Sequence, residues 1–181
     1  MQKQVSIIVP CYNEQNTIHL LLNALYLQSF PRHEMEVIIA DGGSTDKTRA
    51  VIENWQAAHP DLDIKVINNP SKTIPAALNK AINASSADMI IRLDAHSKPY
   101  PGYVERVVTA LEEGRGQNVG GVWEICPQSD HWIARSIASA AAHPIGVGDA
   151  RYRYGDKPAF VDTVPFGAFN RDLLNHVGMF D

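Results

Sequence analysis

Short apolar runs alternate along the chain with longer segments in which apolar residues recur every three or four positions. The short runs are rich in β-branched residues and end at proline, asparagine or aspartate, which predicts strands buried on both faces. The longer segments have the period of amphipathic helices. We expect strands over 4–9, 36–40, 64–67, 88–93 and 119–125. We expect helices over 15–28, 45–58, 74–84, 101–113 and 130–142.

The alternation of strand and helix, with short turns between them, is typical of βαβ units. In such units the strands are parallel and the crossovers are right-handed. The predicted fold class is therefore α/β, with helices on both faces of a mostly parallel sheet. Beyond Pro144 the pattern weakens, and 144–158 is predicted to be a loop or an irregular ribbon.

The length of 181 residues allows one well-buried core, so we expect a single domain over 1–181. The net charge of −4 argues against nucleic acid as the main partner, because backbone binding needs a basic face. No apolar run approaches the roughly 18 to 20 residues of a membrane-spanning helix, and no signal peptide is recognisable. Cys11 and Cys126 form no CxxC motif and fit free thiols in a reducing compartment, so we expect a cytoplasmic protein.

Three of the expected strands run directly into turns that carry acidic residues, over 10–14, 41–46 and 94–96. If these strands are parallel, their carboxyl ends share one edge of the sheet. Open α/β sheets bind their ligands at that edge. We therefore expect a nucleotide site there, with a metal ion beside it.

The turn after the second strand begins with Asp41, whose carboxylate can accept hydrogen bonds from a base N–H or a ribose hydroxyl. Gly42 and Gly43 let the backbone turn sharply and approach a flat ligand closely. Ser44 and Asp46 suit ligand binding, but they also suit the cap of the next helix. The segment is not a P-loop, because Asp46 occupies the position of the second glycine and would repel phosphates.

The turn after the fourth strand offers a carboxylate and an imidazole, from Asp94 and His96. Positions i and i+2 of an extended turn can face one ion, and this pair suits Mn²⁺, Mg²⁺ or a softer divalent ion. A diphosphate would supply further oxygen ligands. The structural alternative is that Asp94 caps a turn while His96 faces solvent.

Other polar residues near these turns have both a ligand-binding and a structural interpretation. Tyr12 could stack on a base. Glu14 could bond a ribose, or could stabilise the start of the next helix through its dipole. Lys72, in the loop after the third strand, could reach a phosphate or remain a solvated surface lysine.

The segments VSIIVPCYNE over 5–14, DGGSTD over 41–46 and LDAH over 93–96 together resemble a family 2 glycosyltransferase with the GT-A fold. The resemblance covers nearly the whole chain. The segments HPIGVG over 143–148 and VDTVPFGAF over 161–169 resemble the subgroup of succinoglycan biosynthesis glucosyltransferases.

The resemblance implies inverting transfer of a sugar from a nucleoside diphosphate, often UDP, to an acceptor hydroxyl in extracellular or surface polysaccharide synthesis. It implies a nucleotide-binding half over about 1–100 and the start of an acceptor-side half over about 101–181. Asp94 would lie near the ribose or the metal, and His96 would take the place of the last carboxylate of the usual Asp-x-Asp. The residues expected to bind the nucleotide sugar are Pro10, Tyr12, Glu14, Asp41, Gly43, Ser44, Lys72 and Asp94.

The resemblance also implies a general base that lies beyond Asp181, so we expect this chain to bind the donor but to transfer sugar poorly. The acceptor is expected to be a saccharide or a lipid-linked saccharide. In the second case the full-length protein would work at the inner face of the membrane, through parts absent from this chain. The alternatives are a non-catalytic nucleotide-binding module and a sugar nucleotidyltransferase. The second is disfavoured because 10–14 contains neither glycine nor arginine.

Overall fold

The computed structural model describes residues 3–127, 129–143, 152 and 157–181. The chain divides into two compact units, one formed by Met1–Val119 with Phe166–Asp181 and the other by Gly120–Pro165. The single domain over 1–181, with its two halves dividing near residue 100, stays a prediction. No helix in the described parts of the chain combines the length and apolar character needed to cross a bilayer.

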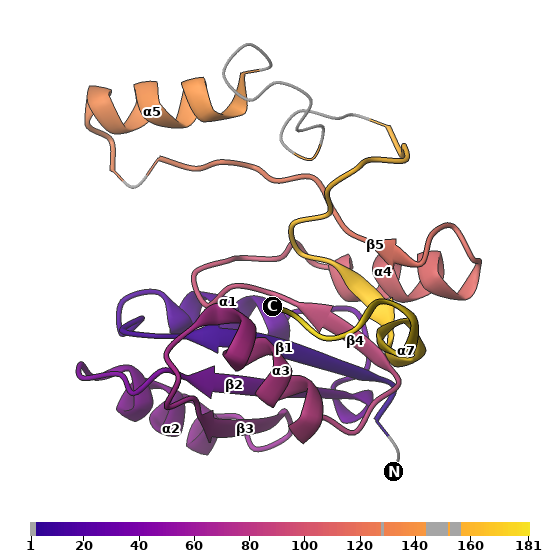
Figure 1. Ribbon diagram of the computed structural model, residues 1–181. Coiled ribbons are helices and arrows are strands. Elements are labelled where there is room, and N and C mark those ends of the chain that lie inside the picture. The colour runs from indigo at the N-terminus through magenta and orange to yellow at the C-terminus, as the bar shows by residue number, and fades with distance from the viewer. Residues whose placement is uncertain (1–2, 128, 144–151, 153–156) are drawn as a thin grey trace. The chain divides into compact units, whose positions relative to one another are not determined.

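The first unit is built on a six-stranded sheet with the order β3-β2-β1-β4-β6-β5 (Figure 1). The strands β3, β2, β1 and β4 are mutually parallel, whereas β6 is antiparallel to both of its neighbours. The strands are β1 Val5–Cys11, β2 Met35–Asp41, β3 Asp63–Asn68, β4 Met89–Arg92, β5 Asn118–Val119 and β6 Ala168–Asn170.

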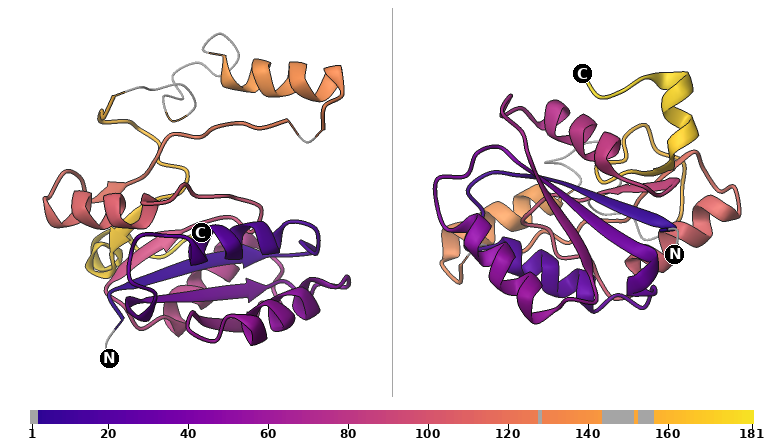
Figure 2. Two further views of the ribbon diagram at one scale, coloured as in Figure 1. Left: turned by 180° about the vertical axis from the view of Figure 1, so that it is seen from behind. Right: turned by 90° about the horizontal axis from the view of Figure 1, so that it is seen from below.

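Helices cover both faces of this sheet, as predicted, and Figure 2 shows α3 on the opposite side from α1 and α2. Alternate residues of each central strand enter the two cores, so Ile7 of β1 packs toward α1 and α2 while Ile8 packs toward α3. The helices of this unit are α1 Ile18–Tyr26, α2 Thr48–Ala58, α3 Ile74–Ala84, α4 Tyr103–Glu112 and α7 Leu174–Val177. Short 3₁₀ turns occupy η1 Arg32–Glu34 and η3 Arg171–Leu173.

The expected helices are all present, with ends shifted by a few residues, and α5 Trp132–Ala142 belongs to the second unit. The strand expected over 119–125 is wrong, because only Asn118–Val119 pairs. This edge strand has β6 as its sole neighbour in the sheet, and the next apolar residues, such as Val122, lie exposed. The expected irregular segment over 144–158 lies almost wholly outside the described residues.

The antiparallel strand β6 was not predicted, and Arg171, the next residue, binds the end of α3 and the loop before β4. Its guanidinium donates to the carbonyl oxygens of Ile82 and Ala87 at 3.1 and 2.8 Å and to the Ser85 hydroxyl at 2.7 Å. Three residues are too few to show a period of two, so nothing in the sequence marks β6 as a strand.

A buried carboxylate joins the amino ends of the central strands. Glu36 of β2 is fully buried and accepts hydrogen bonds from Ser6 at 2.6 Å, Ser86 at 2.8 Å and Lys65 at 2.7 Å. Burial acts to raise the pKa of Glu36, but the bonds from Lys65, Ser6 and Ser86 outweigh it and lower the pKa to about 2. The carboxylate is therefore charged in the folded protein and links β1, β2, β3 and the loop before β4.

We predict that Glu36→Gln lowers the free energy of unfolding by roughly 2 to 3 kcal/mol at pH 7. A carboxyl whose pKa is depressed by folding stabilises the protein fully above its ordinary pKa of 4.5, and this contribution is lost as the pH falls toward about 2. Urea unfolding of both proteins should therefore give a gap that narrows between pH 5 and pH 3. The control is Glu34→Gln, because Glu34 is only half-buried, and this change should alter stability by less than about 0.5 kcal/mol. A gap that stays constant with pH would contradict the role of the Glu36 charge.

Candidate functional site

The three acidic turns meet at the carboxyl edge of the parallel strands, as expected. Cys11, the last residue of β1, pairs with Asp41, the last residue of β2. On the other side of β1, Ile8 pairs with Arg92 of β4, and the Leu93 amide donates to the Ile8 carbonyl oxygen at 3.1 Å. The turns over 10–14, 41–46 and 94–96 therefore leave the sheet side by side.

Side-chain hydrogen bonds join the turn after β1 to the turn after β2. The backbone N–H of Asn13 donates to the Ser44 hydroxyl at 2.9 Å. The backbone N–H of Thr45 donates to the side-chain oxygen of Asn13 at 2.8 Å. The Glu14 amide donates to the Thr48 hydroxyl at 2.7 Å. Asn13 adopts φ +55°, a left-handed conformation that asparagine tolerates. The two turns thus form one hydrogen-bonded rim.

The structure distinguishes between the two residues for which capping was the alternative. Asp46 stands one residue before Lys47, the N-cap of α2, and accepts from the backbone N–H of Thr48 at 2.9 Å and of Gln15 at 3.2 Å. The Ser44 hydroxyl instead donates to Asp41 at 2.5 Å and accepts from Asn13. Ser44 therefore belongs to the rim rather than to the helix terminus.

Asp41 is almost fully buried, and both of its carboxylate oxygens have internal partners. Arg49 donates to Oδ2 at 2.6 Å, and Ser44 donates to Oδ1. Burial raises the pKa of Asp41, but the bonds from Ser44 and Arg49 outweigh it, so its pKa is lowered from the usual value. The carboxylate is ionised and serves in this structure as the internal anion around which the turn folds.

Arg49 is a site residue that sequence reasoning missed. It also donates to the Asn68 side-chain oxygen at 2.5 Å, so it connects the ends of β2 and β3. Its position in the first turn of α2, eight residues after Asp41, is the signal that could have identified it, because that turn faces the same edge of the sheet.

The loop after β3 lies against the glycine turn. Gly43 adopts φ +81°, which favours glycine, and Lys72 adopts φ +57°. A Cβ on Gly43 would lie 3.8 Å from the Lys72 side chain. The backbone N–H of Asn69 donates to the backbone carbonyl oxygen of Asp41 at 2.7 Å. The side-chain oxygen Oδ1 of Asn69 is buried with no hydrogen-bond partner among the described residues. Lys72 is exposed, so its ammonium group is accessible at the rim.

The aromatic ring expected to stack on a base is accessible. Tyr12 is 51% exposed, and a Cβ on Gly42 would lie 3.4 Å from its ring. One face of the rim therefore carries an open ring next to a residue without a side chain. Pro10 lies within β1, pairs with Ala40 and is partly buried.

Asp94 and His96 each contact a side chain of opposite charge character, Arg92 and Glu14 respectively. Arg92 donates to Asp94 at 3.3 Å, and the Nδ1 atom of His96 lies 3.0 Å from a Glu14 carboxylate oxygen. The His96 side chain is 62% exposed and that of Asp94 is 26% exposed. The described residues contain no group of three or more His, Cys, Asp or Glu side chains arranged to hold a metal ion.

The chemistry of Asp94 and His96 nevertheless fits a divalent cation. One carboxylate and one imidazole on an open turn leave coordination positions for water and for phosphate oxygens, as Mn²⁺ and Mg²⁺ require. A cation held this way would depend on the diphosphate for part of its coordination. Such a site would be completed by the ligand rather than closed by protein side chains.

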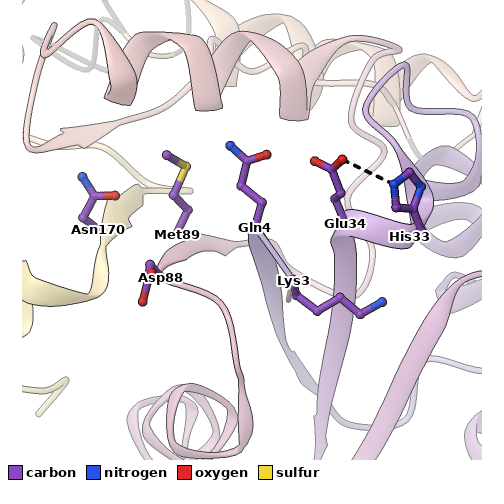
Figure 3. A pocket seen from close by; sticks show the side chains of 7 residues that line it. All are labelled: Lys3, Gln4, His33, Glu34, Asp88, Met89 and Asn170. Carbon is purple, nitrogen blue, oxygen red and sulfur yellow. Dashed lines mark ion pairs between the residues drawn. The ribbon is translucent and has the colours of Figure 1, made fainter. Parts of the chain in front are cut away.

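A pocket of about 510 Å³ lies at the opposite edge of the sheet (Figure 3). Figure 3 marks an ion pair between His33 and Glu34, at 3.4 Å, among the pocket's lining residues. No residue of the acidic turns lines this pocket. Parallel sheets bind ligands at their carboxyl edge, so we do not place the functional site here. The lining residues are Lys3, Gln4, His33, Glu34, Asp88, Met89 and Asn170.

Known proteins match this chain over most of its length. The family model described as "Glycosyl transferase family 2" matches residues 6–178. The succinoglycan biosynthesis protein ExoA of Rhizobium meliloti is 32% identical over 152 residues, which are 82% of this chain and 44% of that protein. A Methanococcus voltae protein is 29% identical over 176 residues, which are 94% of this chain and 54% of that protein. Its name is dolichyl N-acetyl-alpha-D-glucosaminyl phosphate 3-beta-D-2,3-diacetamido-2,3-dideoxy-beta-D-glucuronosyltransferase.

A solved structure matches the whole chain. The mannosyltransferase PcManGT from Pyrobaculum calidifontis, in complex with GDP-Man and Mn²⁺, has a TM-score of 0.72 and 25% identity, over 100% of this chain and 48% of that one. The chain therefore spans about half the length of these relatives. The resemblance drawn from the sequence motifs, including the succinoglycan subgroup and the fold, is confirmed by these matches.

The rim also protects a thiol, which gives a test of its geometry. Burial raises the pKa of Cys11 to about 12, and the carboxylates of Asp41, Glu14 and Asp46 add to the effect. Because the thiolate is the reactive form, we predict that a maleimide at pH 8 modifies the exposed Cys126 at least roughly 10³ times faster than Cys11. Mass spectrometry of the native protein should show one label, and Cys126→Ser should show none. Rapid double labelling of the folded protein would contradict the placement of Cys11.

Proposed function

Because the chain belongs to glycosyl transferase family 2, we propose that it forms the donor-binding part of an enzyme that transfers a sugar from a nucleoside diphosphate to an acceptor hydroxyl. The observation that carries the proposal is the meeting of three turns at one edge of the sheet. There an exposed aromatic ring, an exposed lysine and the Asp94–His96 pair come from three different segments that follow β1, β3 and β4.

In this proposal the residues of the rim divide the donor between them. The ring of Tyr12 stacks on the base, next to the flat surface at Gly42. Lys72 binds the diphosphate as a point charge. Asp94 and His96 hold the cation, which when bound offsets the negative charge on the leaving diphosphate. Asp41 and Arg49 hold the turn in shape rather than serve as open hydrogen-bonding groups.

We also propose that transfer is a single displacement with inversion, which needs a base to accept the proton of the acceptor hydroxyl. The carboxylates of Asp41, Asp94 and Glu14 each have a basic partner on the protein, so none of them is assigned this role. The base is instead expected from residues outside this chain, which covers about half of its relatives.

The nucleotide and the acceptor are proposed from the family and from the relatives. UDP is the nucleotide we expect, and the PcManGT complex with GDP-Man makes GDP the first comparison. The dolichyl phosphate in the name of the Methanococcus voltae relative supports a lipid-linked saccharide as the acceptor, and ExoA supports a role in polysaccharide synthesis. A lipid-linked acceptor would place the reaction at the cytoplasmic face of the membrane.

Calorimetric titration of the chain with UDP, GDP and dTDP, with and without Mn²⁺, tests the proposal. We predict that UDP binds tightest and needs Mn²⁺. Tyr12→Ala should weaken binding about threefold to tenfold, the loss expected for one stacked ring, and Asp94→Ala should weaken it at least about tenfold.

The matched control is Asp88→Ala, because Asp88 is an exposed aspartate at the opposite edge of the sheet and should leave the affinity unchanged. Tight binding of GDP with weak binding of UDP would change the donor but keep the site. No nucleotide binding under any condition would end the proposal.

A further inference from the structure

Glu14, the last residue of the turn after β1, makes contacts that a ribose-binding carboxylate does not need. One carboxylate oxygen lies 3.0 Å from Nδ1 of His96, across 82 residues of sequence. The other oxygen accepts the hydroxyl of Thr17. Both oxygens of Glu14 thus have partners on the protein, and the Glu14 side chain is only 20% exposed.

The backbone of Glu14 is held as firmly as its side chain. Its amide donates to the Thr48 hydroxyl at 2.7 Å, and its carbonyl oxygen accepts from the amides of Thr17 and Ile18 at 3.0 and 2.9 Å. Because hydrogen bonds hold both the backbone and the carboxylate of Glu14, the carboxylate can in turn hold the ring of His96 in place. Because Thr48 begins α2, this also connects Glu14 to the turn after β2.

The contact determines which nitrogen of His96 carries a proton. A carboxylate oxygen only accepts hydrogen bonds, so Nδ1 donates to Glu14 and, in the neutral ring, Nε2 carries the lone pair. Histidines that bind metals commonly donate their other ring N–H to a carboxylate, which sets the tautomer and the direction of the ring. In free neutral imidazoles of histidine the proton prefers Nε2, so Glu14 would reverse the ordinary preference.

We propose that Glu14 is a positioning residue that presents Nε2 of His96 to the divalent cation. The inference rests on the proposed function, because it assumes that His96 binds the cation of a nucleotide–metal complex. It assigns Glu14 to the cation rather than to the ribose. The 3.3 Å contact from Arg92 to Asp94 holds the second cation ligand in the same way, through a partner on the protein.

The first experiment reads the tautomer in protein without metal or nucleotide. In ¹⁵N-labelled protein at about pH 8, where imidazoles are mostly neutral, long-range ¹H–¹⁵N spectra distinguish Nδ1–H from Nε2–H rings. We expect the Nδ1–H form for His96 in the unmodified chain and in Glu14→Gln, whose side-chain oxygen still accepts. Glu14→Ala should shift His96 to the Nε2–H form. An Nε2–H ring in the unmodified chain would overturn the proposal.

The second experiment measures Mn²⁺ affinity by electron paramagnetic resonance, without nucleotide and with saturating UDP. We expect Glu14→Ala to weaken Mn²⁺ binding about tenfold to a hundredfold, the range for loss of a carboxylate behind a metal-bound histidine. Glu14→Gln should recover most of the affinity. Glu34→Ala is the matched control, because Glu34 also pairs with a histidine, His33 at 3.4 Å, but at the opposite edge of the sheet.

The outcomes separate this inference from the proposed function. If His96→Ala weakens Mn²⁺ binding and Glu14→Ala does not, the positioning role is wrong while the cation site stands. If neither variant changes Mn²⁺ binding but UDP still binds, the inference fails and donor binding stands. If UDP never binds but Glu14→Ala still weakens Mn²⁺ binding and shifts the tautomer, Glu14 positions His96 for a cation, and the proposed donor binding is what fails. Circular dichroism of each variant verifies that it is folded.

Discussion

The parallel pairing of β1 with β2 on one side and β4 on the other is the constraint on which the rest of the structure depends. It brings turns from three distant segments of the chain to one edge of the sheet. The strands themselves are held by two apolar cores, because successive residues such as Ile7 and Ile8 enter opposite layers. A change of register by one residue would exchange the two faces and separate the turns.

Charged groups at the two edges of the sheet have different roles. At the amino edge the carboxylate of Glu36 is buried and satisfied by Ser6, Lys65 and Ser86, and it contributes to folding. At the carboxyl edge, Asp41 is neutralised by Arg49, while Asp94 and His96 stay partly open to solvent. Groups that are satisfied internally shape the site, and the open ones are left for a ligand.

The sequence predicted the central elements well because their patterns are strong and local. A β-branched run that ends at Pro10 or Asp41 marks a buried strand, and Pro75 marks the first turn of α3. The prediction of a strand beyond Val119 was wrong, because an apolar run forms a strand only where a neighbouring strand pairs with it. The short β6 was missed because its partners, β4 and β5, are distant in sequence or too short to leave a pattern.

The sequence by itself determined the α/β class, the family resemblance and the types of side chain that follow each strand, since all of these depend on local order along the chain. Only the tertiary structure decided which of those side chains meet. Arg49 bonds Asp41 because the first turn of α2 faces the end of β2, and Glu14 contacts His96 because β1 and β4 are neighbours in the sheet. Both pairs arise from packing, and for Glu14 and His96, which are 82 residues apart, spacing along the chain carries no record of the contact.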